Sequence, residues 1–396
     1  MRILLVPSGF KESISAEKAA ICMKNGIRRV LPKAKVVSLP LVDGGEGFVN
    51  TMVKWTQGSL SHQLVTGPIR QQTEASIGFL GYSSPKTAVI EVASAAGLKW
   101  VPRDQRNPER TTSYGVGELI CAALDQGAKR ILIGCGDSGT HDGGIGMAQA
   151  LGVRFLDPSG HRIDVREGAH VIGQIASIDL STIDPRLQQV SIDVACNWHN
   201  ILCGPHGVTR VFGRQKGATE KQLLRLEKSF EHLSTLIEKT TGHTVDQMPG
   251  GGASGGLGDS LHGLLGATLH PRYDIIMKQL DLDRYLQETD LVLTAEGSID
   301  FQTPRGKIPA EVATRAKRYG KPVIAIAGMI GEGARLNYRH GIDVYTSILQ
   351  SPVPLEKAMA NTEAWLEDSV ESLMRTLWIG QELAATQYQR QVASGQ

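Results

Sequence analysis

Residues 2–41 alternate a strand pattern, a helix pattern and a second strand pattern. Residues 2–6 form a short apolar run, and apolar residues then recur at helical spacing after Ser15, a typical helix N-cap residue. Residues 35–41 are again strand-like and end at a glycine-rich turn. A strand–helix–strand opening implies a parallel sheet with helices on its faces, because parallel neighbours need a crossover connection. We therefore expect an α/β protein.

A buried-strand pattern returns in the C-terminal quarter, at residues 291–294 and 323–327. The chain of 396 residues is longer than one hydrophobic core usually supports, so two domains are expected. We predict a discontinuous Rossmann-like domain with a parallel sheet, built from both ends of the chain, and an α/β domain inserted into it. The predicted ranges are 1–67 and 287–384 for the discontinuous domain, 68–286 for the inserted domain and 385–396 for a polar tail.

The composition excludes several classes of partner. The 42 Lys and Arg residues nearly balance the 40 Asp and Glu residues, so no basic field favours a nucleic acid or a membrane surface. No segment is long and apolar enough to span a bilayer, and the first apolar run is too short for a signal peptide. The five cysteines are odd in number, which favours the cytoplasm over a disulfide framework. The pattern leaves open whether the chain forms a homo-oligomer.

The most informative motif is the glycine-rich segment Gly134–Gly144, here called the glycine loop. It directly follows the apolar strand pattern at residues 130–133. Its five glycines free the backbone to bring N–H groups close to a ligand. Asp137 and Asp142 lie in the same loop, and carboxylates beside a phosphate site are suited to Mg²⁺. The loop therefore predicts phosphoryl transfer with bound Mg²⁺.

The same glycines also allow other interpretations. Gly134, Gly136 and Gly139 match the dinucleotide fingerprint G-x-G-x-x-G, and Asp157 lies near the distance expected for a ribose-binding acid. Asp137 falls inside this fingerprint, where a pyrophosphate would pack with no cation to screen the charge. Phosphate bridged by a metal is therefore favoured. A dinucleotide-binding oxidoreductase remains the alternative, and a plain turn is the third interpretation.

Three further loops follow predicted strands and carry charged or hydroxyl side chains. They are residues 8–13, 43–46 and 296–300. In open parallel sheets, ligands bind at the carboxyl ends of the strands, so these loops are expected to share one cleft with the glycine loop. Lys11 lies where a helix is about to start, a position suited to an anion, although a solvated lysine is the competing interpretation.

Other known site types are absent or weakly indicated. The chain has no P-loop sequence G-x-x-x-x-G-K-[ST] and none of the protein-kinase motifs H-R-D and D-F-G. Cys196, His199, Cys203 and His206 form a compact array of soft ligands that could bind zinc. Their spacing matches no common zinc module, so a turn that happens to contain these residues is the preferred interpretation.

Short segments spread over nearly the whole chain form an ordered set. They are Phe10-Lys11, Ser13, Ser15-Ala16, Asp43-Gly-Gly-Glu-Gly47, Thr112-Ser113, Gly115, Gly117-Glu-Leu119, Asp142-Gly-Gly144, Gln149-Ala-Leu-Gly152, Gln215-Lys-Gly-Ala218, Gly255-Gly256, Gly258, Glu296-Gly297, Asp300, Gln302 and Gly306-Lys307. In this order they resemble the bacterial glycerate kinase family that includes the class I glycerate 2-kinases. The resemblance implies two α/β domains with the active site in the cleft between them. It also implies ATP and Mg²⁺ as cofactors and D-glycerate as acceptor, with 2-phosphoglycerate the favoured product.

Pattern and resemblance together assign the candidate site residues. The predicted catalytic residues are Lys11, Asp43 and Asp142. The residues predicted to bind substrate or nucleotide are Ser13, Glu46, Ser138, Thr140, His141, Gly143, Gly144, Lys216, Gly255, Gly256, Asp300 and Lys307. The predicted metal ligands are Asp137, Asp142 and Glu296.

The sequence departs from the family pattern inside these same loops. The departures are Ser8, Asp137, His141, Asn197, His199 and Ser298. Acids are lost at Ser8 and Asn197, an acid is gained at Asp137, and an arginine is lost at Ser298. A kinase of a related three- or four-carbon sugar acid therefore stays open as an alternative, as does a non-catalytic homologue that binds metabolites.

Overall fold

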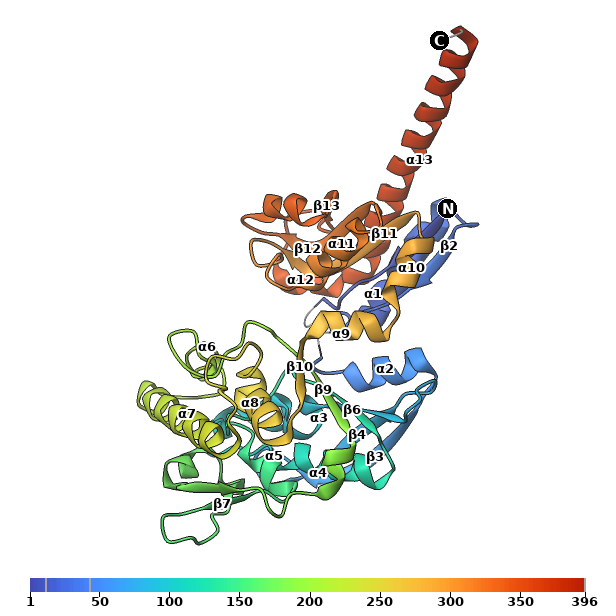
Figure 1. Cartoon of the computed structure of the whole chain (residues 1–396). Coiled ribbons are helices and arrows are strands. Elements are labelled where there is room, and N and C mark those ends of the chain that lie inside the picture. Colours follow the sequence, from blue (N-terminus) through green and yellow to red (C-terminus); the bar gives the residue numbers. More distant parts are fainter. Residues whose placement is uncertain (11–12, 43, 395–396) are drawn as a thin grey trace. The chain divides into compact units, whose positions relative to one another are not determined.

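The computed structural model describes residues 1–10, 13–42 and 44–394, which form two compact units (Figure 1). Unit 1 comprises Met1–Val42 and Met277–Gln396, and unit 2 comprises Asp43–Ile276. The discontinuous arrangement matches the two-domain expectation, but the boundaries differ from the predicted ones. Residues 44–67 join unit 2, because β3 (Ser59–Thr66) pairs along its whole length with β4 (Gln72–Phe79).

Unit 1 is built on a parallel sheet with the strand order β13-β12-β11-β1-β2. Its strands are β1 (Arg2–Leu5), β2 (Lys35–Ser38), β11 (Leu291–Ile299), β12 (Val323–Ile330) and β13 (Val344–Ser347). Ile3 on β1 lies opposite Val36 on one side and Leu291 on the other. The N- and C-terminal segments therefore share one parallel sheet, as predicted.

A local signal marks the start of α1 (Ala16–Val30), the first helix of unit 1. The other helices of this unit are α10 (Leu282–Glu288), α11 (Ile308–Lys317), α12 (Leu355–Ala360) and α13 (Thr362–Ser394), with α9 (Arg272–Gln279) at the boundary of the units. The predicted N-cap is confirmed, since the Ser15 hydroxyl accepts a hydrogen bond from the Lys18 N–H at 3.2 Å. The segment predicted to be a tail is helical up to Ser394.

Unit 2 contains a mixed sheet with the order β10-β9-β6-β5-β4-β3. Its further strands are β5 (Thr87–Glu91), β6 (Arg130–Gly134), β9 (Ser191–Cys196) and β10 (Thr268–Pro271), and β7 (Arg154–Leu156) pairs separately with β8 (Ser177–Asp179). Neighbours among β5, β6, β9 and β10 run parallel, whereas β3, β4 and β5 are antiparallel. The sheet of unit 2 is therefore parallel on one side and antiparallel on the other.

Helices pack on this sheet and enclose two buried apolar clusters. They are α2 (Phe48–Thr56), α3 (Val92–Ala96), α4 (Tyr114–Asp125), α5 (Ile145–Ala150), α6 (Val208–Phe212), α7 (Glu220–Thr241) and α8 (Ala253–Leu265). One cluster joins the sheet to α4 and α8, and the other joins α7 to the β7–β8 pair. None of the described helices combines the length and apolar character that crossing a membrane requires.

The contact between α1 and α13 gives a test of packing in unit 1. A Cβ atom at Gly26 of α1 would lie 2.4 Å from the Glu367 carbonyl oxygen of α13, so Gly26→Ala should lower the free energy of unfolding by about 1–3 kcal/mol. Gly380→Ala is the matched control, because nothing lies within 4 Å of that helical glycine. Alanine there should raise stability by up to about 1 kcal/mol. Calorimetric melting separates the two, and a Gly26→Ala protein as stable as the parent would contradict the packing argument.

Candidate active site

The glycine loop begins at the carboxyl end of β6, where it meets a second glycine segment. A Cβ atom at Gly134 would lie 2.5 Å from Cδ1 of Phe48, and one at Gly136 would lie 2.7 Å from Cα of Gly45. No side chain therefore fits at either position. These glycines allow two backbones to approach closely, a role that the sequence pattern did not distinguish from an open phosphate cradle.

Asp137 follows Gly136 and is held by a hydrogen bond to the neighbouring glycine segment. Its backbone is left-handed, with φ of 48°, and its Oδ2 accepts a hydrogen bond from the Glu46 N–H at 3.1 Å. The Glu46 carboxylate in turn pairs with Lys99 at 2.9 Å. Asp137 and Glu46 were predicted in separate loops, and the structure brings them together at an exposed position.

Asp142 has a different environment from the one expected for a metal ligand. Its side chain is fully buried, and its Oδ2 accepts hydrogen bonds from both N and Oγ of Ser113 at 2.8 Å. Gly144 and Gly146 donate their N–H groups to the same carboxylate at 3.2 and 3.3 Å. Burial raises the pKa of this carboxyl, and these hydrogen bonds act in the opposite direction. The geometry ties the loop to the starts of α4 and α5.

The predicted magnesium ligands are divided between the units, with Asp137 and Asp142 in unit 2 and Glu296 in unit 1. Over residues 1–10, 13–42 and 44–394, no group of three or more His, Cys, Asp or Glu side chains is arranged to hold a metal ion. Asp142 is saturated by protein donors, and Glu296 belongs to β11 of unit 1. Of the three, only Asp137 is exposed. The described residues of unit 2 therefore contain no preformed set of Mg²⁺ ligands.

Lys216 lies beneath the glycine loop. It is only 7% exposed, and its Nζ donates to Ser138 Oγ at 3.0 Å and to the Thr140 carbonyl oxygen at 2.6 Å. Burial lowers the pKa of this amine to about 7, and the nearby Asp142 carboxylate opposes the shift. Three residues that were predicted separately thus meet here, and the lysine supports the loop from inside.

His141 is also an internal support. Its ring is fully buried, packs 5.0 Å from the ring of Phe230, and shares a 2.9 Å hydrogen bond between Nε2 and Thr209 Oγ1. Burial lowers the pKa of the imidazole well below its ordinary value, so the ring is neutral. The histidine links the glycine loop to α6 and α7.

The second predicted glycine pair lies directly on the glycine loop. Gly255 and Gly256 have positive φ angles of 76° and 89°, and a Cβ at Gly255 would lie 2.2 Å from the Thr140 carbonyl oxygen. The Gly143 N–H donates to the Gly255 carbonyl at 3.0 Å. Glycine is needed here both for the backbone conformation and for the close approach.

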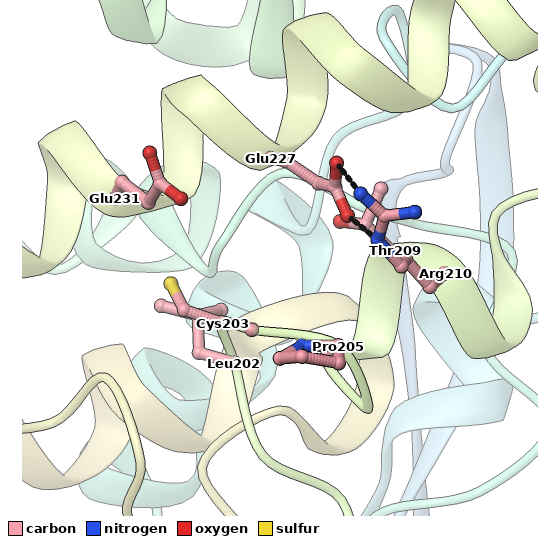
Figure 2. Close-up of a pocket in the computed structure, with 9 residues that line it drawn as sticks. Leu202, Cys203, Pro205, Thr209, Arg210, Glu227 and Glu231 are labelled. Carbon is pink, nitrogen blue, oxygen red and sulfur yellow. Dashed lines mark hydrogen bonds and ion pairs between the residues drawn. The ribbon is translucent and has the colours of Figure 1, made fainter.

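A pocket of about 430 Å³ lies beside this assembly, between the loop that precedes α6 and the helix α7 (Figure 2). Figure 2 shows Arg210 paired with Glu227, and Glu231 farther along α7.

Cys203 lies across the pocket from these residues, and burial together with nearby carboxylates raises the pKa of its thiol to about 12. Among the described residues, the Cys and His side chains of the possible zinc array do not form a group that could hold a metal ion. Within this array, Cys196 donates instead to the His270 carbonyl, which agrees with the turn interpretation.

Unit 1 contributes a separate polar cluster at the carboxyl end of β11. Lys307 Nζ donates to Ser298 Oγ and to both carboxylate oxygens of Asp300, each at 3.3 Å. Burial raises the pKa of Asp300, but the Gln302 N–H and the Lys307 charge outweigh this effect, so the pKa lies below its ordinary value. The predicted residues Asp300 and Lys307 are therefore brought together.

The remaining predicted residues divide into two groups. Ser13 Oγ donates to Thr362 Oγ1 at 2.7 Å and to the Met359 carbonyl at 3.0 Å, so it joins the first loop to α12 and α13. Lys11 and Asp43 lie outside the described residues.

Sequence reasoning missed a buried acid, Glu91, at the carboxyl end of β5. It lies opposite Gly134 in the strand register and is 6% exposed. The sequence feature that could have identified Glu91 is its position, since it directly follows the apolar segment Ala88–Ile90 and precedes another apolar segment.

Comparison with known proteins gives a consistent result. A model described as the glycerate kinase family matches residues 3–378. The chain is 46% identical to a glycerate kinase of Bacillus subtilis (95% of this chain, 98% of the relative) and 42% identical to a glycerate 2-kinase of Escherichia coli (96% and 99%). It is also similar to a crystal structure of a Salmonella typhimurium LT2 protein assigned as glycerate kinase 2, with a TM-score of 0.84, 42% identity, and coverage of 96% of this chain and 99% of that one.

The hydrogen bonds of Asp142 predict a loss of stability on substitution. In Asp142→Asn, an amide NH₂ replaces one oxygen and faces N–H donors, so a buried donor loses its acceptor at a cost of about 1–3 kcal/mol. Asp137→Asn is the control, because that residue is exposed and asparagine tolerates its left-handed backbone. Its stability should change by less than about 0.5 kcal/mol. Urea unfolding measures both, and equal stabilities would show that Asp142 does not anchor the loop.

The buried Lys216 amine should make the free energy of unfolding depend on pH. Its pKa is about 7 in the folded protein and 10.5 in the unfolded chain, so between these values the unfolded chain binds the extra proton and stability rises with pH. Relative to Lys216→Met, the parent should therefore gain stability from pH 7 to pH 9, by at most about 1.4 kcal/mol per pH unit. Unfolding of both proteins across this range measures the difference, and a constant difference would contradict a depressed pKa.

Proposed function

The chain belongs to the glycerate kinase family, and from this premise we propose that it transfers the γ-phosphoryl group of ATP to D-glycerate, forming 2-phosphoglycerate. The observation that carries the proposal is similarity over nearly the full length, at 46% and 42% identity, to relatives named glycerate kinase and glycerate 2-kinase. The family is one of kinases that phosphorylate an alcohol group, so the open points are the acceptor and the hydroxyl used.

Charged residues of the chain support the transfer of a phosphoryl group. Phosphoryl transfer depends on positioned positive charge and a rigid site, with little covalent work for the protein. Lys307 presents an ammonium group at the carboxyl end of β11, where its side chain is 24% exposed and ordered by Asp300. We assign it, with Lys11, to neutralise charge on the carboxylate or the phosphoryl group.

The glycine loop gives the reaction a fixed framework. Lys216, His141 and Asp142 hold it from inside, so it need not reorganise when substrate binds. When Mg²⁺ is bound with ATP, it supplies further neutralisation of phosphate charge. Because the described residues of unit 2 offer no preformed set of ligands, we propose that the ion arrives on the nucleotide and that the exposed Asp137 contacts it.

The dinucleotide-binding alternative gains no support from the loop geometry. A fingerprint of this kind needs glycines that face a pyrophosphate. Gly134 and Gly136 instead face Phe48 and Gly45, at distances that leave no space for a ligand against them. A related sugar acid remains the second candidate acceptor. It is favoured by Ser298, which stands where the family usually has arginine and here bonds directly to Lys307.

We also propose that the protein works in the cytoplasm. All five of its cysteines are free thiols in the described structure, and four of them are buried. This state is typical of a reducing compartment.

The proposal predicts ATP-dependent formation of 2-phosphoglycerate from D-glycerate. ADP release should be measured across three- and four-carbon sugar acids, and ³¹P and ¹³C NMR should identify the phosphorylated hydroxyl. Activity should disappear when EDTA removes Mg²⁺ and return when the ion is restored. Faster turnover of another sugar acid would overturn the choice of acceptor, and binding of ATP without turnover of any acid would favour a non-catalytic homologue.

A further inference from the structure

Glu91 is a buried carboxyl group that the proposed function does not yet use. It is the last residue of β5 and lies opposite Gly134, where the glycine loop begins. Its side chain turns toward the start of α2, and its Oε2 accepts a hydrogen bond from the Val49 N–H at 3.3 Å. One carboxyl thus touches the first turn of a helix at the edge of the candidate site.

The start of α2 depends on this carboxyl. The N-cap residue is Gly47, which has no side chain to accept hydrogen bonds from the free N–H groups of the first turn. A carboxylate at this point satisfies such a group and also interacts favourably with the positive end of the helix dipole. Glu91 therefore performs, from a neighbouring strand, the task that a capping side chain usually performs locally.

The turn formed by residues 44–47 connects this helix start to the glycine loop. On its other side, Gly45 packs against Gly136, and the Glu46 N–H donates to Asp137 Oδ2 at 3.1 Å. Asp43, predicted to be catalytic, immediately precedes the turn in sequence. Displacement of the start of α2 would move the turn and open its contact with the glycine loop.

We propose that Glu91 is a positioning residue for phosphoryl transfer, whose carboxylate holds the start of α2 and thereby keeps the 44–47 turn against the glycine loop. This inference rests on the proposed function for its kinetic readout. The contact itself is independent of the identity of the acceptor.

The charges around Glu91 determine when it can act. Burial raises its pKa to about 7, the Val49 N–H and Lys99 lower it, and Glu46 raises it. Asp137, which accepts the Glu46 N–H, is a further charged group on the described part of these loops. The ionised carboxylate is the stronger partner for the helix start, so the turn is held more firmly as the pH rises through 7.

The kinetic test compares Glu91→Gln with the parent and with Glu74→Gln, an exposed acid on the adjacent strand β4. The kcat/KM of the parent and of Glu74→Gln should rise between pH 6 and pH 8. The kcat/KM of Glu91→Gln should not show this rise. At pH 6 it should match that of the parent within about threefold. At pH 8 it should be about tenfold lower, which corresponds to the loss of one interaction with a charged group. Lys216 and ATP also titrate in this range, but they do so in all three proteins, so the difference reports on Glu91.

Amide hydrogen exchange gives a readout that needs no substrate. Peptides covering residues 44–53 should exchange faster in Glu91→Gln than in the parent at pH 8. If Glu91→Gln does not fold, Gly136→Ala serves instead, because its Cβ would separate the turn from the loop while leaving Glu91 intact. That variant should lose at least about tenfold in kcat/KM.

The outcomes separate the two proposals. An unchanged pH profile and unchanged exchange in Glu91→Gln, or a fully active Gly136→Ala, would overturn the positioning role. A parent protein that phosphorylates no sugar acid would contradict the proposed function alone, because exchange over residues 44–53 would still decide whether Glu91 holds the turn.

Discussion

The organisation of unit 2 depends on backbone-to-backbone contact among three glycine segments. Gly136 faces Gly45, and Gly255 faces Thr140, with distances from their would-be Cβ atoms of 2.7 Å and 2.2 Å. Side chains would force these segments apart. Because each segment begins or ends a helix, the contact also determines where α2, α5 and α8 start relative to the carboxyl edge of the sheet.

Close backbone contact leaves little room for side chains to stabilise the loop from outside, and the stabilising groups are buried. Asp142 accepts four hydrogen bonds, Lys216 donates two, and His141 packs against the Phe230 ring and shares a hydrogen bond with Thr209. Buried ionisable groups are costly unless their hydrogen bonds are satisfied. Asp142, predicted to be catalytic, and Lys216 and His141, predicted to bind substrate or nucleotide, thus also support the loop, and their ionisation is coupled to folding. This coupling is the reason why catalytic and structural effects of substitution must be measured separately.

Unit 1 follows a different principle. Its polar residues gather where parallel strands end, and Lys307, Asp300 and Ser298 hold one another in place without full burial. Partial exposure leaves the ammonium group of Lys307 accessible to an anionic ligand. A rigid glycine framework in one unit and ordered, accessible charge in the other are both requirements of phosphoryl transfer.

The sequence by itself determined the local elements and the class of fold. The N-cap at Ser15 and the buried strands of the N- and C-terminal segments are read from neighbouring residues, because capping and apolar periodicity are local properties. It also identified the loops of the candidate site and brought out the family resemblance that the comparisons bear out.

Only the tertiary structure decided what individual residues in those loops do. Asp142 meets Ser113 across 29 positions, Lys216 meets Ser138 across 78, and Glu91 meets Val49 across 42. Strand pairing likewise moved β3 into unit 2. No local pattern encodes such contacts, because they arise when distant segments are packed together, and burial then determines whether a carboxylate or an amine faces a ligand or the protein itself.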